Sequence, residues 1–349
     1  MGMRSASRNV VGLDIEPGYV AAVQGTGGRV AVERAACAAL APGAVHDGEV
    51  ADVEALADTL RELFAQHKLS KRVRLGVANQ RIVMRAIDLP PLTDAKEISS
   101  AVQFQAQDHI PMPLEQAILE HQVLGQVETP EGPRTRVMVV AARRDMIDRL
   151  LEAANRAGLS PQGIDLSAFA MIRALHRSGS SDPVLYVNVG GITNLAVAEG
   201  TTCTFTRAIP YGTESIAGEL AQRRALTLEH AHGWLVHVGL LEPVEDMDGD
   251  QSIIEEARAV LAEGARRVGD EVRNSLDFHS AREGALAVAR VILTGPAVAI
   301  PGFADEVAGR IGLPFEVGLV QEAKPGGFGG VDAGRLAVAA GLTVTEIDS

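Results

Sequence analysis

The sequence predicts an α/β protein with two lobes built on one plan, and two matching segments carry most of that prediction. The first segment is VVGLDIEPGYVAAVQG, residues 10–25, and the second is VLYVNVGGITNLAVAEG, residues 184–200. Each contains an apolar run, an Asp or Asn, a turn with glycine and a second apolar run. A third strand-like run and a helical pattern follow each segment, which indicates two copies of a βββα unit.

Composition and charge exclude several functions. The 349 residues are enough for more than one domain, and the net charge of −13 argues against binding nucleic acid or anionic lipid. No apolar stretch reaches the ~20 residues that span a bilayer, and the N-terminal MGMRSASRN lacks the core of a signal peptide. Cys37 and Cys203 have no metal-ligand spacing and are expected to be free thiols. We therefore expect a cytoplasmic protein without direct membrane insertion.

The first half begins with strands and continues with a helix. Pro17-Gly18 between the first two strands suits a type II turn, and Asp52 is a plausible N-cap for the helix. The expected strands are 9–15, 19–25, 30–40, 72–79 and 82–90, and the expected helix is 52–67.

The next stretch has a different sequence pattern and is expected to be an inserted subdomain, residues 92–163. Asp94 begins a helix that ends near Gln107, before the sequence IPMP. Strands 117–128 and 134–143 and an amphipathic helix, 145–159, come next, with Gly158 as the C-cap of that helix. Residues 164–177 read as a helix that returns to the first lobe, which we assign to 1–91 and 164–183.

The second lobe, 184–349, repeats the plan with its own insertion. Three strands occupy 184–209, and a helical part follows at about 211–284 with an acidic loop at 242–251. A buried strand at 285–295, a helix at 301–314 and a strand at 315–320 come after it. The expected last helix, about 331–342, follows a glycine-rich loop and would pack back on the first lobe.

Four stretches together carry a resemblance to a known family. They are GLDIEPGYVAAV near the N-terminus, QFQAQDHIPMPLEQAILEHQVLG (103–125), VMVVAARRDMIDRLLEAANRAGLSPQGIDLSAFAMIRAL (137–175) and VILTGPAVAIPGFADEVAGRIGLP (291–314). In this order they resemble the PilM family of type IV pilus assembly proteins, relatives of FtsA in the actin/Hsp70 ATPase superfamily. The resemblance implies an actin-like (ribonuclease H-like) two-lobed fold with duplicated βββα domains and a small inserted α/β subdomain.

The resemblance also implies where a nucleotide site would lie. In the family, the two hairpin turns point backbone N–H groups at the phosphates of ATP, and carboxylates beside them hold Mg²⁺. Asp14 stands at the first carboxylate position. The alternative interpretation is that Asp14 has a structural role, with its carboxylate accepting hydrogen bonds from nearby backbone N–H groups in the turn. The remnant ATP site consists of Asp14, Gly18, Asn188, Gly190, Gly191, Thr193 and Gly295.

Several residues depart from what that site needs. Glu16 would place a negative charge beside a triphosphate, and Pro17 has no N–H to donate. Asn188 replaces a carboxylate that would accept a proton from water. Where the family has a helix Glu and Lys and a Gly-rich adenosine loop, this chain has His232, Leu235 and Pro296. We expect a degenerate site with no catalytic residue, no metal and no resident cofactor; ATP and Mg would bind only if the remnant still functions.

A partner site is implied by the inserted subdomain. In the family, this subdomain and the first domain form a groove for the cytoplasmic N-terminal tail of PilN, a membrane protein, and residues 72–125 of this chain would line it. The candidate contacts are Gln103, Gln107, His109 and Glu115. The alternative is that these four are ordinary surface residues.

The resemblance implies a scaffold for a pilus or secretion platform, held at the inner face of the membrane by partners that include platform proteins and motor ATPases. The alternatives are an ATP-binding or ATP-hydrolysing switch and an FtsA-like filament protein.

Overall fold

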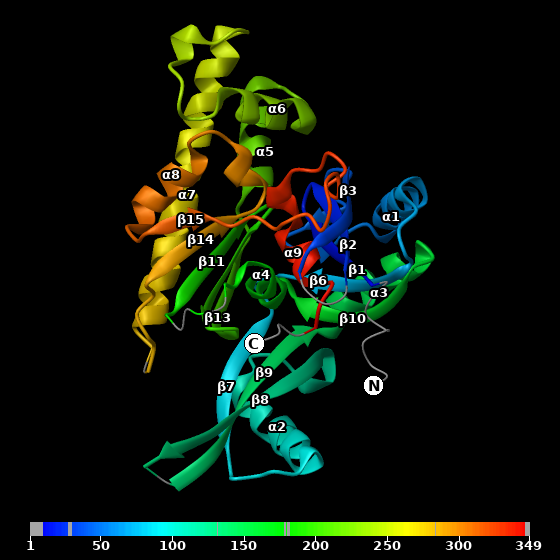
Figure 1. Ribbon diagram of the computed structural model, residues 1–349, viewed down its shortest axis with the longest axis vertical. Coiled ribbons are helices and arrows are strands. Elements are labelled where there is room, and N and C mark those ends of the chain that lie inside the picture. The colour runs from blue at the N-terminus through cyan, green and yellow to red at the C-terminus, as the bar shows by residue number, and fades with distance from the viewer. Residues whose placement is uncertain are drawn as a thin grey trace. The chain divides into compact units, whose positions relative to one another are not determined.

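The computed structural model describes residues 10–26, 30–130, 132–177, 179, 182–282 and 284–345, in two units (Figure 1). The larger unit comprises Met1–Asn79 and Ala153–Ser349, and the smaller comprises Gln80–Glu152. The N-terminal segment 1–9, expected to contain no signal peptide, lies outside the described residues.

Two five-stranded sheets of the same topology form the centre of the larger unit. The first has the order β10-β6-β1-β2-β3, and the second, read in the equivalent direction, has β15-β14-β11-β12-β13. In each, the first hairpin is antiparallel and its leading strand pairs in parallel with a later strand. The first sheet's strands are β1 (Val11–Glu16), β2 (Tyr19–Gly25), β3 (Val32–Ala39), β6 (Arg72–Val77) and β10 (Ser160–Leu166). The second sheet's strands are β11 (Val184–Val189), β12 (Thr193–Glu199), β13 (Thr202–Ile209), β14 (Arg290–Thr294) and β15 (Phe315–Val317).

Helices in the larger unit begin at side-chain caps where the sequence offers them. Asp52 accepts hydrogen bonds from the backbone N–H groups of Glu54 and Ala55 at the start of α1, and Asp250 caps α7 in the same way. The α-helices are α1 (Val53–His67), α4 (Ser167–Leu175), α5 (Thr213–Arg224), α6 (Leu228–Val238), α7 (Gln251–Ser280), α8 (Phe303–Ile311) and α9 (Ala337–Gly341). Shorter elements are β4 (Val45–His46), β5 (Glu49–Val50) and the 3₁₀ turns η2 (Val244–Asp246), η3 (Pro296–Ala299) and η4 (Ala333–Leu336). Helix α3 (Arg144–Arg156) begins in the smaller unit and ends in the larger.

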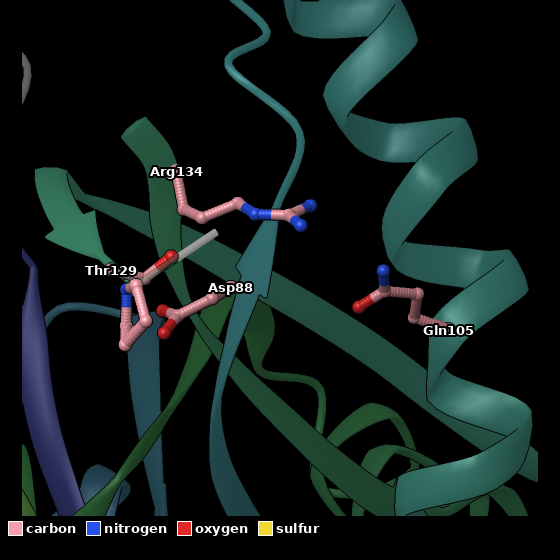
Figure 2. Close-up of a pocket in the computed structure, with 5 residues that line it drawn as sticks. Asp88, Gln105, Thr129 and Arg134 are labelled. Carbon is pink, nitrogen blue, oxygen red and sulfur yellow. The ribbon is translucent and has the colours of Figure 1, made fainter. Parts of the chain in front are cut away.

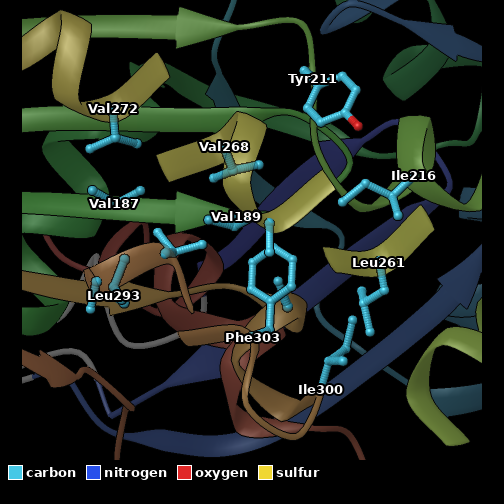
Figure 3. Packing of buried hydrophobic residues seen from close by; sticks show 14 of the residues in the cluster. Val187, Val189, Tyr211, Ile216, Leu261, Val268, Val272, Leu293, Ile300 and Phe303 are labelled. Atoms are coloured by element: carbon cyan, nitrogen blue, oxygen red, sulfur yellow. The ribbon is translucent and has the colours of Figure 1, made fainter. Parts of the chain in front are cut away.

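The core of the second lobe lies between its sheet and helices α5 to α8. Val187 and Leu293 from neighbouring strands belong to one buried cluster with Val268 and Val272 of the long helix α7. Figure 3 shows the ring of Phe303, from α8, among these side chains. This burial supplies the main stabilisation of the lobe that carries the second hairpin.

The C-terminal helix α9 packs on the first sheet and on α4. The contact is close because glycines meet backbone there: a Cβ at Gly12 would lie 1.9 Å from the carbonyl oxygen of Ala339, and one at Gly341 would lie 1.8 Å from that of Ala170. Arg74 donates to the carbonyl oxygen of Leu342 over 2.7 Å. The end of the chain is therefore part of the first lobe's core.

The smaller unit is a three-stranded antiparallel sheet, ordered β7-β9-β8, with one helix on a face. Its elements are β7 (Val83–Leu89), α2 (Ala95–His109), η1 (Leu114–Gln116), β8 (Ala117–Thr129) and β9 (Gly132–Arg143). Asp94 caps α2, whose Ile98, Val102 and Ala106 pack on Val137 and Val139 of β9. Within the described residues β8 is an edge strand, and most of its side chains are exposed.

Two segments differ from the sequence predictions in the unit or the type of element to which they belong. Residues 82–90 were assigned to the first lobe, but β7 pairs with β9 inside the smaller unit. Residues 160–166, partly expected to be helical, form β10, which pairs in parallel with β6 at the edge of the first sheet. Helix α4 accordingly begins at Ser167 rather than at 164.

Candidate functional site

The two equivalent hairpin turns of the larger unit touch each other. Gly18 sits in the β1–β2 turn with a φ of +88°, the conformation that a type II turn requires after Pro17. Gly191 lies in the β11–β12 turn, and a Cβ placed on it would lie 2.1 Å from the carbonyl oxygen of Pro17. Only glycine permits this approach, so the turns pack backbone to backbone.

The carboxylate of Glu16 reaches from the first hairpin into the second turn. The Asn188 amide donates to Glu16 Oε1 over 3.2 Å, and the backbone N–H of Ile192 donates to Glu16 Oε2 over 3.2 Å. A Cβ at Gly190 would lie 2.6 Å from the same Oε2 atom. The second turn therefore already holds a carboxyl group, and this chain supplies it.

Asp14 and Glu16 form a buried acidic pair. Burial raises the pKa of Asp14 well above its ordinary value, and the charge of Glu16 raises it further. Burial raises the pKa of Glu16 to about 7, although the amides of Ile192 and Gly191 and the charge of Arg335 act in the opposite direction. Near neutral pH the pair thus carries less negative charge than two exposed carboxylates would.

Arg335 and Tyr19 complete this junction. The Arg335 guanidinium, from η4, lies 4.7 Å above the centre of the Tyr19 ring, and its charge opposes the rise that burial causes in the pKa of the Cys37 thiol. The Tyr19 hydroxyl is buried and, among the described residues, has no hydrogen-bond partner. It faces the spot that Glu16 fills, since a Cβ at Gly190 would lie 3.1 Å from it.

The start of helix α5 is hydrogen-bonded to the β11–β12 turn. The backbone N–H and the hydroxyl of Thr213 both donate to the carbonyl oxygen of Gly190, over 2.8 and 2.9 Å. The hydroxyl of Thr193 donates over 2.8 Å to the carbonyl oxygen of Tyr211. The hydroxyl that the remnant site would offer to a phosphate is therefore engaged with the protein backbone.

The region where the resemblance puts adenosine is nearly filled. His232, Leu235 and Pro296 line a cavity of about 30 Å³ together with Arg335, a volume that suits one or two water molecules. Gly295, with φ +100°, follows β14, and a Cβ on it would lie 2.7 Å from Asn188 Oδ1.

The structure gathers the predicted residues of the remnant site around the ends of β1, β11 and β14. Sequence reasoning missed Tyr19, Arg335 and Glu214, although Glu214 Oε2 would lie 2.2 Å from a Cβ on Gly18 and is 2.9 Å from His232 Nε2. Tyr19 lies in the first hairpin itself, at the start of β2, but nothing local in the sequence links Arg335, from η4, or Glu214, from α5, to the hairpins.

The four candidate partner contacts all lie on the smaller unit and are all exposed. Gln103 and Gln107 share one stripe of α2, whereas His109 is on another side of that helix. Glu115, in η1, lines an open pocket of about 280 Å³ with Asp145 and Asp148. These residues do not form one compact site.

A larger pocket of about 440 Å³ lies between α2 and the β8–β9 hairpin (Figure 2). The Arg134 side chain extends across it towards Gln105, and Thr129 and Asp88 lie on the strand side. Asp88 accepts two hydrogen bonds of 2.7 Å from Arg136, which lower the pKa of its carboxyl group. The pocket is open and polar.

Comparison with known proteins places the chain in a family. The family model for type IV pilus assembly protein PilM matches residues 12–322. The chain belongs to the PilM family. A solved PilM-PilN type IV pilus biogenesis complex contains a chain that is similar to it, with 25% identity, a TM-score of 0.79 and coverage of 96% of this chain and 97% of the other.

More distant structures share the actin-like fold of this PilM family member. The ethanolamine utilization protein EutJ from Carboxydothermus hydrogenoformans is 17% identical with a TM-score of 0.52, covering 95% of this chain and 88% of EutJ. MreB5 of Spiroplasma citri bound to ADP is 15% identical with a TM-score of 0.54, covering 95% and 94%. Among the described residues, no helix is both long and apolar enough to cross a membrane.

Proposed function

We propose that this PilM family protein is a cytoplasmic scaffold of a type IV pilus or related secretion platform, and that its nucleotide site is degenerate. It would bind the cytoplasmic tail of a PilN-like membrane protein and so be held at the inner face of the membrane, beside platform proteins and motor ATPases. The observation that carries the degenerate site is the Glu16 carboxylate seated in the second hairpin turn.

The residues at the junction do not fit a triphosphate. Two buried carboxyl groups, Asp14 and Glu16, occupy the region where the phosphates would lie, and any negative charge that they retain would repel a triphosphate. The carbonyl oxygen of Pro17 faces Gly191 and offers an acceptor where a donor is needed. The 30 Å³ cavity beside Pro296 is far below the 300–1,000 Å³, roughly, of common ligand pockets.

The partner follows from the family and from an open sheet edge. A PilM chain similar to this one was solved in a complex with PilN. The edge strand β8 of this chain exposes Val123, at 47%, and Leu124, at 37%. An extended tail that added to this edge would gain backbone hydrogen bonds and contacts with apolar side chains, as in strand-addition complexes.

We expect Val123→Arg to weaken binding of a PilN-like tail peptide by tenfold or more, since it places a charge in the apolar contact. Val236→Arg is a matched control, because Val236 is 51% exposed but lies on α6 in the larger unit. Fluorescence anisotropy with a labelled tail peptide measures both affinities.

The outcomes of this titration test the β8 binding site and the scaffold role separately. Equal affinities for the two variants and the parent would show that the tail does not bind at β8, but would not contradict the scaffold role. A parent protein that binds no tail peptide would contradict the scaffold itself.

A nucleotide switch is the second candidate, because MreB5, which has the same fold, was solved with ADP. A switch would change its affinity for the tail when Mg-ATP is added, whereas a scaffold with a filled site would not.

A further inference from the structure

We propose that the outer edge of β15, in the second lobe, binds an extended segment of another protein, which adds to the five-stranded sheet as a further strand. The segment would carry apolar side chains at alternate positions. This site lies in the larger unit and is separate from the β8 edge that the proposed function assigns to a PilN-like tail.

Three apolar side chains are exposed in a row along this edge. Phe315 is 38% exposed, Val317 is 40% exposed, and Leu319, two residues later, is 49% exposed. Residues two apart in an extended chain share a face of the sheet. Val317 pairs with Leu293 of β14, which belongs to the buried core of the lobe. The exposed row therefore continues the apolar core of the second lobe to the edge of its sheet.

The backbone groups of the same three residues point away from the sheet. On the side of β14, the N–H of Val291 donates over 2.8 Å to the carbonyl oxygen of Pro314. The N–H of Gly318 donates over 2.8 Å to the carbonyl oxygen of Leu293. Because alternate residues of a strand direct their N–H and C=O groups to opposite sides, the groups of the exposed residues face outward. Within the described residues, β15 ends the strand order of this sheet (Figure 1).

The equivalent edge of the first sheet is protected against pairing, whereas the edge of β15 is not. Strand β10 contains Pro161, which has no N–H, and its register with β6 is interrupted between Pro161 and Gly163. Prolines, bulges and charges are the usual means by which edge strands avoid a partner. Strand β15 pairs with β14 without a register shift. Its one charged side chain, Glu316, is engaged by Arg177 and Arg290.

The chain itself shows how an extended segment covers an edge of this kind. Segment 321–327 starts two residues after Leu319 and runs along β3, at the other edge of the first sheet. The N–H of Val32 donates over 2.9 Å to Gln321, and the N–H of Ala35 donates over 2.8 Å to Gly327. The β3 edge is thus covered from within the chain, and the β15 edge is the one presented to a partner.

The size of the edge favours a short segment over a second copy of this chain. A stable dimer buries roughly 800 Å² on each partner, and a fully buried aromatic side chain contributes about 150–250 Å². Three side chains that are already half covered supply much less than the dimer needs. An extended segment gains backbone hydrogen bonds as well as side-chain contacts, so it can bind a narrow edge.

Peptide display tests this proposal. A phage library of random short peptides is selected against the immobilised full-length protein, and the selected peptides are measured by fluorescence anisotropy. We expect them to carry apolar residues at alternate positions and to bind Val317→Arg tenfold or more weakly than the parent. Methylation of one alternate set of backbone nitrogens in the best peptide should weaken binding tenfold or more, because those N–H groups pair with β15. Methylation of the other set should have little effect.

Matched variants control for charge and folding. Val236→Arg should bind the peptides like the parent, because Val236 is 51% exposed but lies on helix α6. Leu319→Arg repeats the test if Val317→Arg does not fold, since Leu319 is the most exposed of the three residues. Peptides that bind these edge variants as tightly as the parent would overturn the proposal, as would a selection that enriches no peptide.

Other occupants of the edge give different results. Self-association of the parent that Val317→Arg abolishes, measured by sedimentation, would assign the edge to a second copy and overturn the proposal. A PilN-like tail peptide should bind Val317→Arg and the parent equally, and a tenfold loss would place the tail at β15 and overturn the proposal of a separate site. The scaffold role is tested with Val123→Arg, so its failure can be told apart from failure of the β15 site.

Discussion

Glu16 is the residue at which the two lobes are joined by a polar contact in the buried junction. Its carboxylate accepts from Asn188 and Ile192, which lie 172 and 176 residues later in the chain. Neutral Asn188 is well matched to this role, because a carboxylate at that position would face Glu16 with like charge. The two departures from the family pattern that weaken a nucleotide site therefore complement each other.

The pKa of Glu16 predicts how stability depends on pH. Its value is about 7 in the folded protein and about 4.5 as the ordinary value, so the folded state holds more protons between these limits. The free energy of unfolding should therefore fall as pH rises from 4.5 to 7, by as much as about 3 kcal/mol. Glu16→Gln should lack this loss and be more stable than the parent, by a margin that grows up to pH 8.

Urea unfolding of the parent and of Glu16→Gln at pH 5 and pH 8 measures the effect. Exposed Glu54→Gln serves as the control and should retain the parent's dependence on pH. Parallel behaviour of the parent and Glu16→Gln would show that Glu16 does not titrate in this range.

At the scale of elements, the two hairpins depend on glycine at their contact. We expect Gly191→Ala to destabilise the larger unit by about 2 kcal/mol or more, because its Cβ would lie 2.1 Å from the backbone oxygen of Pro17, which cannot move aside. Gly218→Ala, in the interior of α5, meets no heavy atom within 4 Å and should be stabilising by about 0.5–1 kcal/mol. Chemical denaturation compares the two, and equal stability would mean that the turns are not in tight contact.

Local patterns were enough to predict most elements but not their partners. The caps Asp52 and Asp94 and the hairpin strands followed from short-range rules, and the structure has them. Strand β10 was missed because Pro161 and Gly163 interrupt its pattern, and proline is tolerated there only because β10 is an edge strand. β14 begins at Arg290 rather than 285, since apolar composition alone does not mark where pairing starts.

As with the fold, the sequence predicted the parts of the candidate site that have a local signal and not those that depend on distant contacts. Sequence reasoning found the turn residues Gly18, Gly190 and Gly191 because glycine-containing turns recur in the two halves. It read Glu16 only as a charge that disfavours phosphate and could not find Arg335, which is 319 positions from Glu16 in the sequence. Contacts of this kind depend on how the lobes meet, and no local periodicity records that.

At the scale of the whole molecule, duplication accounts for the architecture of the larger unit. Two sheets of equivalent strand order bring equivalent turns together, and α9 of the last segment packs on the first sheet. In the PilM family protein described here, the turns meet through the backbone at Pro17 and Gly191 and through the side chain of Glu16. The smaller unit, with its open β8 edge, is then the part that the proposed scaffold role assigns to a partner.

The most direct test of this account is to titrate the full-length protein with a PilN-like tail peptide by calorimetry. The titration is done with and without about 1 mM Mg-ATP, a concentration at the upper end of common KM values. A scaffold with a filled nucleotide site predicts the same Kd, within about twofold, in both titrations. A tenfold change in Kd on adding Mg-ATP would contradict it and establish a nucleotide-dependent switch.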